Sequence, residues 1–235
     1  MRFETVHFEL DAPIASVTLD RPELHNAYSL RMRDELFEVF DACRRDEEIR
    51  VVVLRGAGPS FCAGADLTEF GTAPSPFVAR RIRFERDVWS TFASIPVPIV
   101  AGLHGHVIGS GLELATLSTY RVAAHSATIR MPETQLGLLP AAGATQTLPA
   151  RMGPMRARSL LYRGGPISAE EALRCGLADE VVADDDLADR LREIAERIAT
   201  VPRETLCAIV RLLWLQLAFT PGGAARIERL VAGLT

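Results

Sequence analysis

The stretch that decides the fold runs from Pro98 to Gln146. Its first part, Pro98–Ala115, reads PIVAGLHGHVIGSGLELA. It begins with the apolar run Ile99–Ala101, which is typical of a buried strand, and ends with Leu112–Ala115, which has the pattern of a helix start. Strand, glycine-rich turn and helix in this order present backbone N–H groups at a helix N-terminus, where the helix dipole favours an oxygen anion. The glycines that would form the turn are Gly102, Gly105, Gly109 and Gly111.

Two acidic residues belong to the same region. Glu113 falls in the first turn of the expected helix, and Glu133 follows Met131 and Pro132 in an otherwise apolar context. An acid in a first helical turn is often present only because it complements the helix dipole, and Glu133 has many arginines available for a salt bridge. A carboxylate among apolar residues is nevertheless costly unless it is paired or functional, so both acids are candidates for proton transfer.

Other interpretations of the glycine-rich turn fail on single residues. A dinucleotide-binding fingerprint would need a glycine in place of Leu114, and a P-loop would need a lysine, which the sequence lacks. A nucleophilic Ser110 in a Gly-x-Ser-x-Gly motif would need glycines at positions 108 and 112. His104 and His106 have no third ligand that completes a convincing set, so we expect no metal site. A tight turn chosen for backbone freedom stays as the simplest alternative.

Composition bounds the class of protein. The chain has 235 residues, is 48% hydrophobic and carries a net charge of −4, which favours one large domain, or one domain with a small appendage, and argues against a broad nucleic-acid surface. No apolar block resembles a signal peptide or a membrane span, so we expect a cytoplasmic protein with no membrane partner. The cysteines are widely spaced and form no Cys-x-x-Cys pair, which fits a reduced setting; they are Cys43, Cys62, Cys175 and Cys207.

Strand, loop and helix recur along the first part of the chain. Their recurrence predicts an α/β domain of stacked, similar units. The elements expected from pattern are a hairpin of residues 3–10 and 14–19, a helix from Ser29 to Cys43, an apolar strand at Val51–Leu54 typical of a sheet covered on both faces, a helix over Val78–Ser94, and a strand at Arg121–Ala124.

From Ser168 onward the pattern becomes helical. Ser168 is a good N-cap with acids in the following turn, and Gly176 is a good stop. Further helices are expected over Leu187–Ile198 and Glu204–Phe219, with a last helical piece after the break at residues 221–223. The apolar helix at 204–219 should pack on the core or on another subunit. We therefore expect an α/β core over residues 1–182 and a helical C-terminal region over residues 183–235.

Taken together and in this order, the motifs resemble the enoyl-CoA hydratase/isomerase (crotonase) family. The resemblance extends from about Leu19 to Val182, and the pair of motifs FCAGADL and GSGLELA at this distance is highly specific. The segments that carry it are Asp20–Pro22, Asn26–Ala27, Phe61–Leu67, Gly109–Ala115, Pro132–Glu133, Leu136–Gly137, Pro140, Gly143, Thr145–Gln146, Gly165–Ala172 and Gly176–Leu177.

The resemblance implies a spiral of ββα units whose helical C-terminal region makes trimer contacts, often in a dimer of trimers. It implies an acyl-CoA thioester as substrate, with coenzyme A as part of that substrate and no separate cofactor. The thioester oxygen would accept hydrogen bonds from the backbone N–H groups of Ala65 and Ser110, an oxyanion hole for the enolate. Residues around the thioester would be Ala27, Ala63, Gly64, Asp66, Leu67, Gly109 and Gly111.

By the same resemblance, Glu113 would activate water for attack at the β-carbon and Glu133 would exchange the proton at the α-carbon. Retention of both acids favours an enoyl-CoA hydratase; the alternatives are an isomerase, another crotonase-type reaction such as thioester hydrolysis, and a non-catalytic acyl-CoA-binding homologue. The chain departs from the family pattern at Ser110, usually glycine, at Thr119, commonly Asp, and at Thr147, often Arg. Its C-terminal region is shorter than usual in the family, which bears on CoA affinity and oligomeric state.

Overall fold

The computed structural model describes residues 3–75, 77–78, 81 and 85–216. Its larger sheet has six strands in the order β1-β2-β3-β4-β6-β9, in which β1 and β2 form an antiparallel hairpin and all other neighbours are parallel. A smaller sheet has the order β5-β7-β8. The strands are β1 (Val6–Asp11), β2 (Ile14–Leu19), β3 (Val51–Gly56), β4 (Ile99–Leu103), β5 (His106–Ile108), β6 (Tyr120–Ala124), β7 (Thr128–Arg130), β8 (Ile167–Ser168) and β9 (Glu180–Val182).

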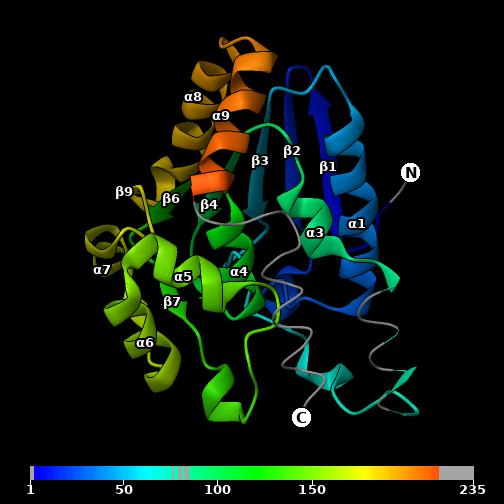
Figure 1. The fold of residues 1–235 in the computed structure, drawn as a ribbon, viewed down its shortest axis with the longest axis vertical. Helices are drawn as coiled ribbons and strands as arrows, with labels where there is room; N and C mark the ends of the chain where they lie inside the picture. Colours follow the sequence, from blue (N-terminus) through cyan, green and yellow to red (C-terminus); the bar gives the residue numbers. More distant parts are fainter. Residues whose placement is uncertain (1–2, 76, 79–80, 82–84, 217–235) are drawn as a thin grey trace.

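Helices cover both faces of the larger sheet (Figure 1). Helices α1 and α3 pack together on one face and α8 packs on the other, against β3, β4 and β6. The α-helices in the described part of the chain are α1 (Leu30–Arg45), α3 (Val88–Ala93), α4 (Ser110–Leu117), α5 (Ala144–Met152), α6 (Pro154–Arg163), α7 (Ala169–Cys175), α8 (Leu187–Ala199) and α9 (Arg203–Gln216), and short 3₁₀ helices lie at Pro22–Leu24, Leu67–Glu69, Glu133–Leu136 and Asp184–Asp186.

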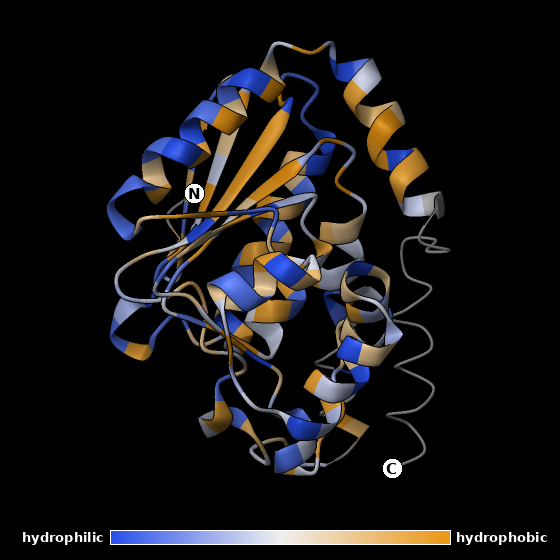
Figure 2. Ribbon diagram, turned by 90° about the vertical axis from the view of Figure 1, so that its left-hand side faces the viewer, coloured by the Kyte–Doolittle hydropathy of each residue, from blue (hydrophilic) through white to orange (hydrophobic). Residues whose placement is uncertain are grey.

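Strand β3 shows why the sheet needs two covering layers. Its alternate side chains point to opposite faces, so Val52 and Leu54 join the core under α1, whereas Val51 and Val53 join the second core under α8. All four side chains are buried, as predicted from the unbroken apolar run. The strands of the larger sheet are correspondingly hydrophobic along much of their length (Figure 2).

The repeating unit divides its strands between the two sheets. In the unit β4–β5–α4, the first strand belongs to the larger sheet and the second to the smaller one. The same division holds in β6–β7–α5. Each unit therefore turns away from the larger sheet before its helix begins, which confirms the expected α/β domain of similar units and sets α4 and α5 beside one another (Figure 1).

Local signals located several helix ends correctly. The hydroxyl of Ser29 accepts a hydrogen bond from Met32 N at 3.2 Å and starts α1. The hydroxyl of Ser168 accepts one from Glu171 N at 3.2 Å and starts α7, which ends at Gly176 with a φ of +84°. These helix boundaries agree with the sequence prediction, because capping depends on residues within one turn of the helix end.

One predicted helix was wrong. The expected single helix over 78–94 is interrupted at residues 86–87, and α3 starts afresh because the Asp87 carboxylate accepts a hydrogen bond from Ser90 N at 3.1 Å. Asp87 is therefore an N-cap and not a helix-interior acid. The expected end of the last apolar helix at 217–219 and the piece after residue 223 lie outside the described residues, and the division at residue 182 stays a prediction.

Candidate active site

The segment that contains Ala65 lies beside the segment that leads into α4. Cys62 and Val107 form a parallel β-bridge, and Ile108 N donates a hydrogen bond to Cys62 O at 3.0 Å. One step along, Tyr28 N donates to Gly64 O at 2.8 Å and Asp66 N donates to Tyr28 O at 2.9 Å. In a parallel bridge of this kind the N–H of the middle residue, here Ala65, points away from the partner strand.

Three glycines permit this close approach. A Cβ atom at Gly64 would lie 3.0 Å from Ile108 O, and one at Gly111 would lie 2.5 Å from Cys62 O. Gly109 has a φ of +52°, and a Cβ there would lie 2.6 Å from Oε1 of Glu133. The structure thus brings together the two glycine-containing motifs and Glu133, which are widely separated in the sequence.

Helix α4 begins where the two glycine-containing motifs meet. Gly109 N donates to Arg130 O at 3.0 Å, so the turn before the helix is held by β7. Within the described part of the chain, neither Ala65 N nor Ser110 N donates a hydrogen bond to a protein acceptor. Unpaired amides at and beside a helix N-terminus are groups that can donate hydrogen bonds to an oxygen with negative charge.

Glu113 is buried, with 2% of its surface exposed. Its Oε1 accepts hydrogen bonds from Ala142 N at 2.8 Å and from Ala144 N at 3.2 Å. These amides belong to the turn that starts α5, in which Gly143 has a φ of +115°. The carboxylate therefore serves the N-terminus of a second helix, a role that its position in the first turn of α4 did not reveal.

Glu133 has a contrasting environment at the start of its 3₁₀ helix. Its Oε2 is buried and has no hydrogen-bond partner among the described residues. Burial raises the pKa of the Glu133 carboxyl, because the charged form loses its hydration. No arginine that the structure describes forms an ion pair with it, so the salt-bridge interpretation of this acid is not supported.

The remaining predicted site residues belong to the loop that supports Ala65. Ala63 N donates to His25 O at 2.9 Å, and Leu67 is exposed. Asp66 forms an ion pair with Arg21 at 3.1 Å, and Arg21 also donates to Ala27 O at 2.7 Å.

The Asp66 carboxylate is fully engaged by its own protein. Hydrogen bonds from Thr68, followed by the contact with Arg21, hold the pKa of Asp66 below its usual range. This side chain therefore organises the loop, and a contact with substrate would fall to the backbone of this segment.

Asn26 is a supporting residue that sequence reasoning gave no role. It is fully buried in a left-handed conformation with a φ of +57°. Its Nδ2 donates to Ala57 O and Ser60 O at 2.9 and 2.6 Å, and its Oδ1 accepts from Arg21 N at 2.8 Å. Asparagine tolerates this backbone conformation and satisfies three backbone groups at once, which explains its place before Ala27.

A family model described as enoyl-CoA hydratase/isomerase matches residues 9–218. The chain belongs to the enoyl-CoA hydratase/isomerase family. It is 32% identical over 228 residues to a probable enoyl-CoA hydratase of Bacillus subtilis (strain 168), covering 95% of this chain and 87% of that one. It is 35% identical over 206 residues to 1,2-epoxyphenylacetyl-CoA isomerase of Escherichia coli (strain K12), covering 86% and 78%. It is 36% identical over 198 residues to (E)-benzylidenesuccinyl-CoA hydratase of Thauera aromatica, covering 83% and 76%.

Solved structures of the family agree. The crystal structure of an enoyl-CoA hydratase from Bacillus anthracis superposes with a TM-score of 0.86 at 30% identity, covering 98% of this chain and 90% of that one. The fold is therefore the crotonase fold, as the sequence motifs implied. Among the residues that the structure describes, no helix is long and apolar enough to cross a membrane, and no group of three His, Cys, Asp or Glu side chains could hold a metal ion.

Proposed function

We propose that this family member is an enoyl-CoA hydratase, which adds water across the 2,3 double bond of an enoyl-CoA thioester. The observation that carries the proposal is the pair of acids around the start of α4. Glu113 is held by amides of the α5 turn. Glu133 places its Oε1 beside Gly109, and its buried Oε2 has no hydrogen-bond partner among the described residues. Coenzyme A is part of the substrate, and the proposal requires no further cofactor.

In the proposed complex the thioester oxygen accepts hydrogen bonds from Ala65 N and Ser110 N. When a nucleophile attacks the β-carbon, negative charge moves to this oxygen as an enolate. A fixed donor aimed at such an oxygen is worth about 2.7–4 kcal/mol in a site that excludes water. Backbone amides suit this task because they cannot rotate away, and Gly64 and Gly109 leave space for the thioester to approach. Ala27, Ala63, Leu67 and Gly111 would line the same approach.

The two acids then act at adjacent carbons. Glu113, whose carboxylate is held by amide donors, accepts a proton from the water whose oxygen bonds to the β-carbon. Glu133 in its protonated form donates a proton to the α-carbon as the enolate collapses. The raised pKa of Glu133 supports this assignment, because a general acid must keep its proton near neutral pH.

An enoyl-CoA isomerase is a second candidate. One observation favours it: Glu113 already has two amide partners, whereas Glu133 has an oxygen free to exchange a proton. In an isomerase Glu133 alone would remove a proton at one carbon and return it at another. One relative that is 35% identical to this chain, from Escherichia coli, is named as an isomerase.

The test is turnover of crotonyl-CoA by the purified protein. A hydratase removes the ultraviolet absorbance of the conjugated thioester and yields a product heavier by one water in mass spectrometry. An isomerase moves the double bond of a 3-enoyl-CoA without a change in mass. Binding of an acyl-CoA in calorimetry without either product, across a panel of chain lengths, would indicate a non-catalytic homologue and overturn both candidates.

We also propose that the protein assembles as a homotrimer or as a dimer of trimers. Helix α6 and the turn after Glu133 contact each other and expose large apolar side chains to solvent, which favours burial against another subunit. Light scattering coupled to size-exclusion chromatography measures the mass directly, and a monomer at micromolar concentration would contradict the proposal. The exposed side chains are Leu136, Leu138, Leu139, Met155 and Tyr162.

A further inference from the structure

Buried polar contacts connect α4 and α5 along their whole shared length. Glu113 meets the turn at residues 142–144, Thr116 meets Thr147, and the carbonyls at the end of α4 meet Arg151. Because positions advance together on both helices, α4 and α5 run in the same direction, and both N-termini lie at the candidate active site. We call these contacts the α4–α5 ladder.

The middle of the ladder is a pair of threonine hydroxyls. Thr116 and Thr147 are 0% and 1% exposed, and their Oγ1 atoms lie 2.8 Å apart. Thr116 Oγ1 also donates to Glu113 O at 3.0 Å, and Thr147 Oγ1 donates to Gly143 O at 3.2 Å. Two hydroxyl protons are available for these three contacts, so one hydroxyl donates to the other while the second donates to its backbone carbonyl. The bond between the hydroxyls then links α4 to α5 next to the backbone of Glu113.

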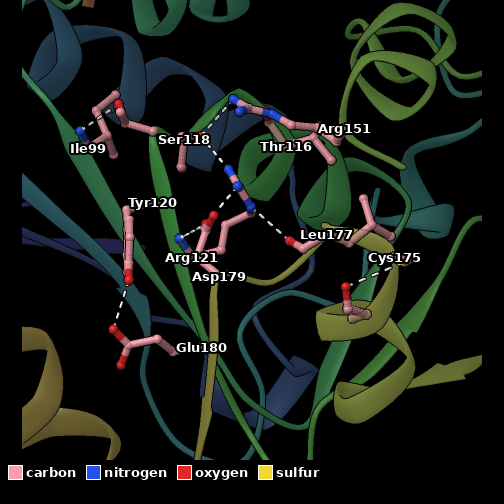
Figure 3. Close-up of polar contacts among 12 residues, drawn as sticks. Ile99, Thr116, Ser118, Tyr120, Arg121, Arg151, Cys175, Leu177, Asp179 and Glu180 are labelled. Carbon is pink, nitrogen blue, oxygen red and sulfur yellow. Dashed lines mark hydrogen bonds and ion pairs between the residues drawn. The ribbon is translucent and has the colours of Figure 1, made fainter. Parts of the chain in front are cut away.

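The far end of the ladder is held by arginines. The guanidinium of Arg151 donates to Thr116 O at 3.3 Å and to Ser118 O at 3.2 Å. Ser118 O also accepts from Arg121, whose Nη1 lies 2.7 Å away (Figure 3). Cations at the C-terminal end of a helix complement its dipole, so this end of α4 is fixed while its N-terminal amides face the site.

We propose that Thr147 is a positioning residue for Glu113, an inference that rests on the proposed hydration reaction. The amides that hold the Glu113 carboxylate belong to Ala144, the first residue of the helix that contains Thr147, and to Ala142, which precedes the N-cap of that helix. One residue of helix rises about 1.5 Å, so a slide of α5 along α4 by less than one residue would separate these amides from Oε1. Of the side-chain contacts between α4 and α5 that oppose this slide, the hydroxyl pair lies nearest to Glu113.

The choice of residue supports this role. Valine has nearly the shape of threonine, and both positions are buried, so filling the space does not by itself require a hydroxyl at either position. A buried hydroxyl is costly unless it is hydrogen-bonded, and here one hydroxyl accepts from the other and has a backbone carbonyl within reach of its own proton.

The experiment compares Thr147→Val with Thr147→Ser, using hydration of crotonyl-CoA. For Thr147→Val we expect kcat to fall about tenfold, equal to about 1.4 kcal/mol in the barrier, with KM changed by less than about twofold. The acidic limb of the pH–kcat profile should move to higher pH, because a carboxylate with weaker amide donors is easier to protonate. Thr147→Ser keeps the hydroxyl and should restore both quantities.

The matched control is Thr5→Val. Thr5 is also a buried threonine, and it lies just before β1, where its hydroxyl donates to the Glu35 carboxylate of α1 at 2.7 Å. This variant should lose stability without a change in kcat or in the pH profile. Equal kcat and pH profile in Thr147→Val and wild type, or equal losses in Thr147→Val and Thr147→Ser, would overturn the inference. If Thr147→Val does not fold, Thr116→Val and Thr116→Ser break and restore the same pair from the other helix.

A second measurement separates this inference from the proposed function. Carbon-detected NMR can follow the titration of the Glu113 carboxyl without any substrate. We expect its midpoint to rise in Thr147→Val and to return in Thr147→Ser. If the wild type hydrates no enoyl-CoA while this shift is present, the proposed function fails and the positioning role stands. If hydration is normal and the midpoint is the same in all variants, the positioning role fails alone.

Discussion

Glu113 and Glu133 lie at the same site in opposite environments. Glu113 is buried with its carboxylate held by amides at the start of α5, whereas Glu133 has a buried oxygen without a partner in the described chain. Amide donors stabilise a charged carboxylate, and burial without donors favours its protonated form. The comparison teaches that the surrounding backbone can give one residue type two opposite environments at one site, and the proposed base and acid roles rest on this contrast.

The largest effect should come from Glu133→Gln. The amide keeps the size of the side chain but can neither give nor take a proton, so we expect kcat to fall about 10²–10⁴-fold in hydration and in isomerisation alike. KM should change little, because the oxyanion amides are untouched. Steady-state kinetics with crotonyl-CoA measures both values. Wild-type kcat in this variant would show that Glu133 is not the acid and would break the comparison.

Glu113→Gln should separate the two candidate reactions. The glutamine Oε1 can still accept from Ala142 N and Ala144 N, so the α5 turn is kept while the base is lost. We expect hydration to fall about 10²–10³-fold, within the range for loss of a general base, while exchange of the α-proton in heavy water continues through Glu133. Isomerisation that stays near wild-type rate in this variant, with no hydration in either protein, would favour the isomerase.

Gly109→Ala tests the closeness of Glu133 to the turn before α4. A Cβ atom would lie 2.6 Å from Glu133 Oε1 in a backbone conformation that L-residues rarely adopt. We expect a loss in kcat of about tenfold or more, because displacements of about 1 Å at an active site cost up to about a hundredfold. The matched control is Gly71→Ala, which also has a positive φ but nothing within 4 Å of the added Cβ. Equal kinetics in the two variants would contradict the placement of Glu133.

The sequence predicted the parts of this site that depend on short-range pattern. The apolar runs located β3 and β4, and the glycines of the turn before α4 indicated a close backbone approach that Gly109 and Gly111 indeed make. Ser29 and Ser168 marked helix starts because a cap acts within a single turn. The family motifs supplied the long-range pairing of these pieces, which no local pattern contains.

The environment of each acid could not be predicted in the same way. The donors to Glu113 come from residues 142–144, and their position depends on how α5 packs beside α4. The partner of Thr116 is likewise 31 residues away. Asp87 shows the same limit for a helix boundary. An acid in a helical pattern fits a helix interior and an N-cap equally well, and the structure shows an N-cap at the start of α3, which packs on α1.

The smallest expected effect is on thermal stability, and it is tested by comparing Glu133 with Glu35. Because the folded pKa of Glu133 is raised, the folded state binds more protons than the unfolded state, and stability falls as pH rises through the interval between the two pKa values. Glu133→Gln removes this penalty, so near neutral pH its Tm should exceed that of wild type, by a few degrees at most, and the difference should vanish at low pH.

Glu35→Gln is the control with the opposite sign. Burial alone would raise the pKa of Glu35, but hydrogen bonds from Thr5, Arg31 and Glu4 outweigh it and hold that pKa below its usual range. Its stabilising contribution is present above the unfolded pKa and is lost as pH falls through the folded one, so Glu35→Gln should lower Tm most near neutral pH. Thermal unfolding of both variants from acidic to neutral pH measures the two trends. Trends of the same sign would mean that Glu133 is hydrogen-bonded as a carboxylate, and its assignment as the proton donor would then fail together with the contrast to Glu113.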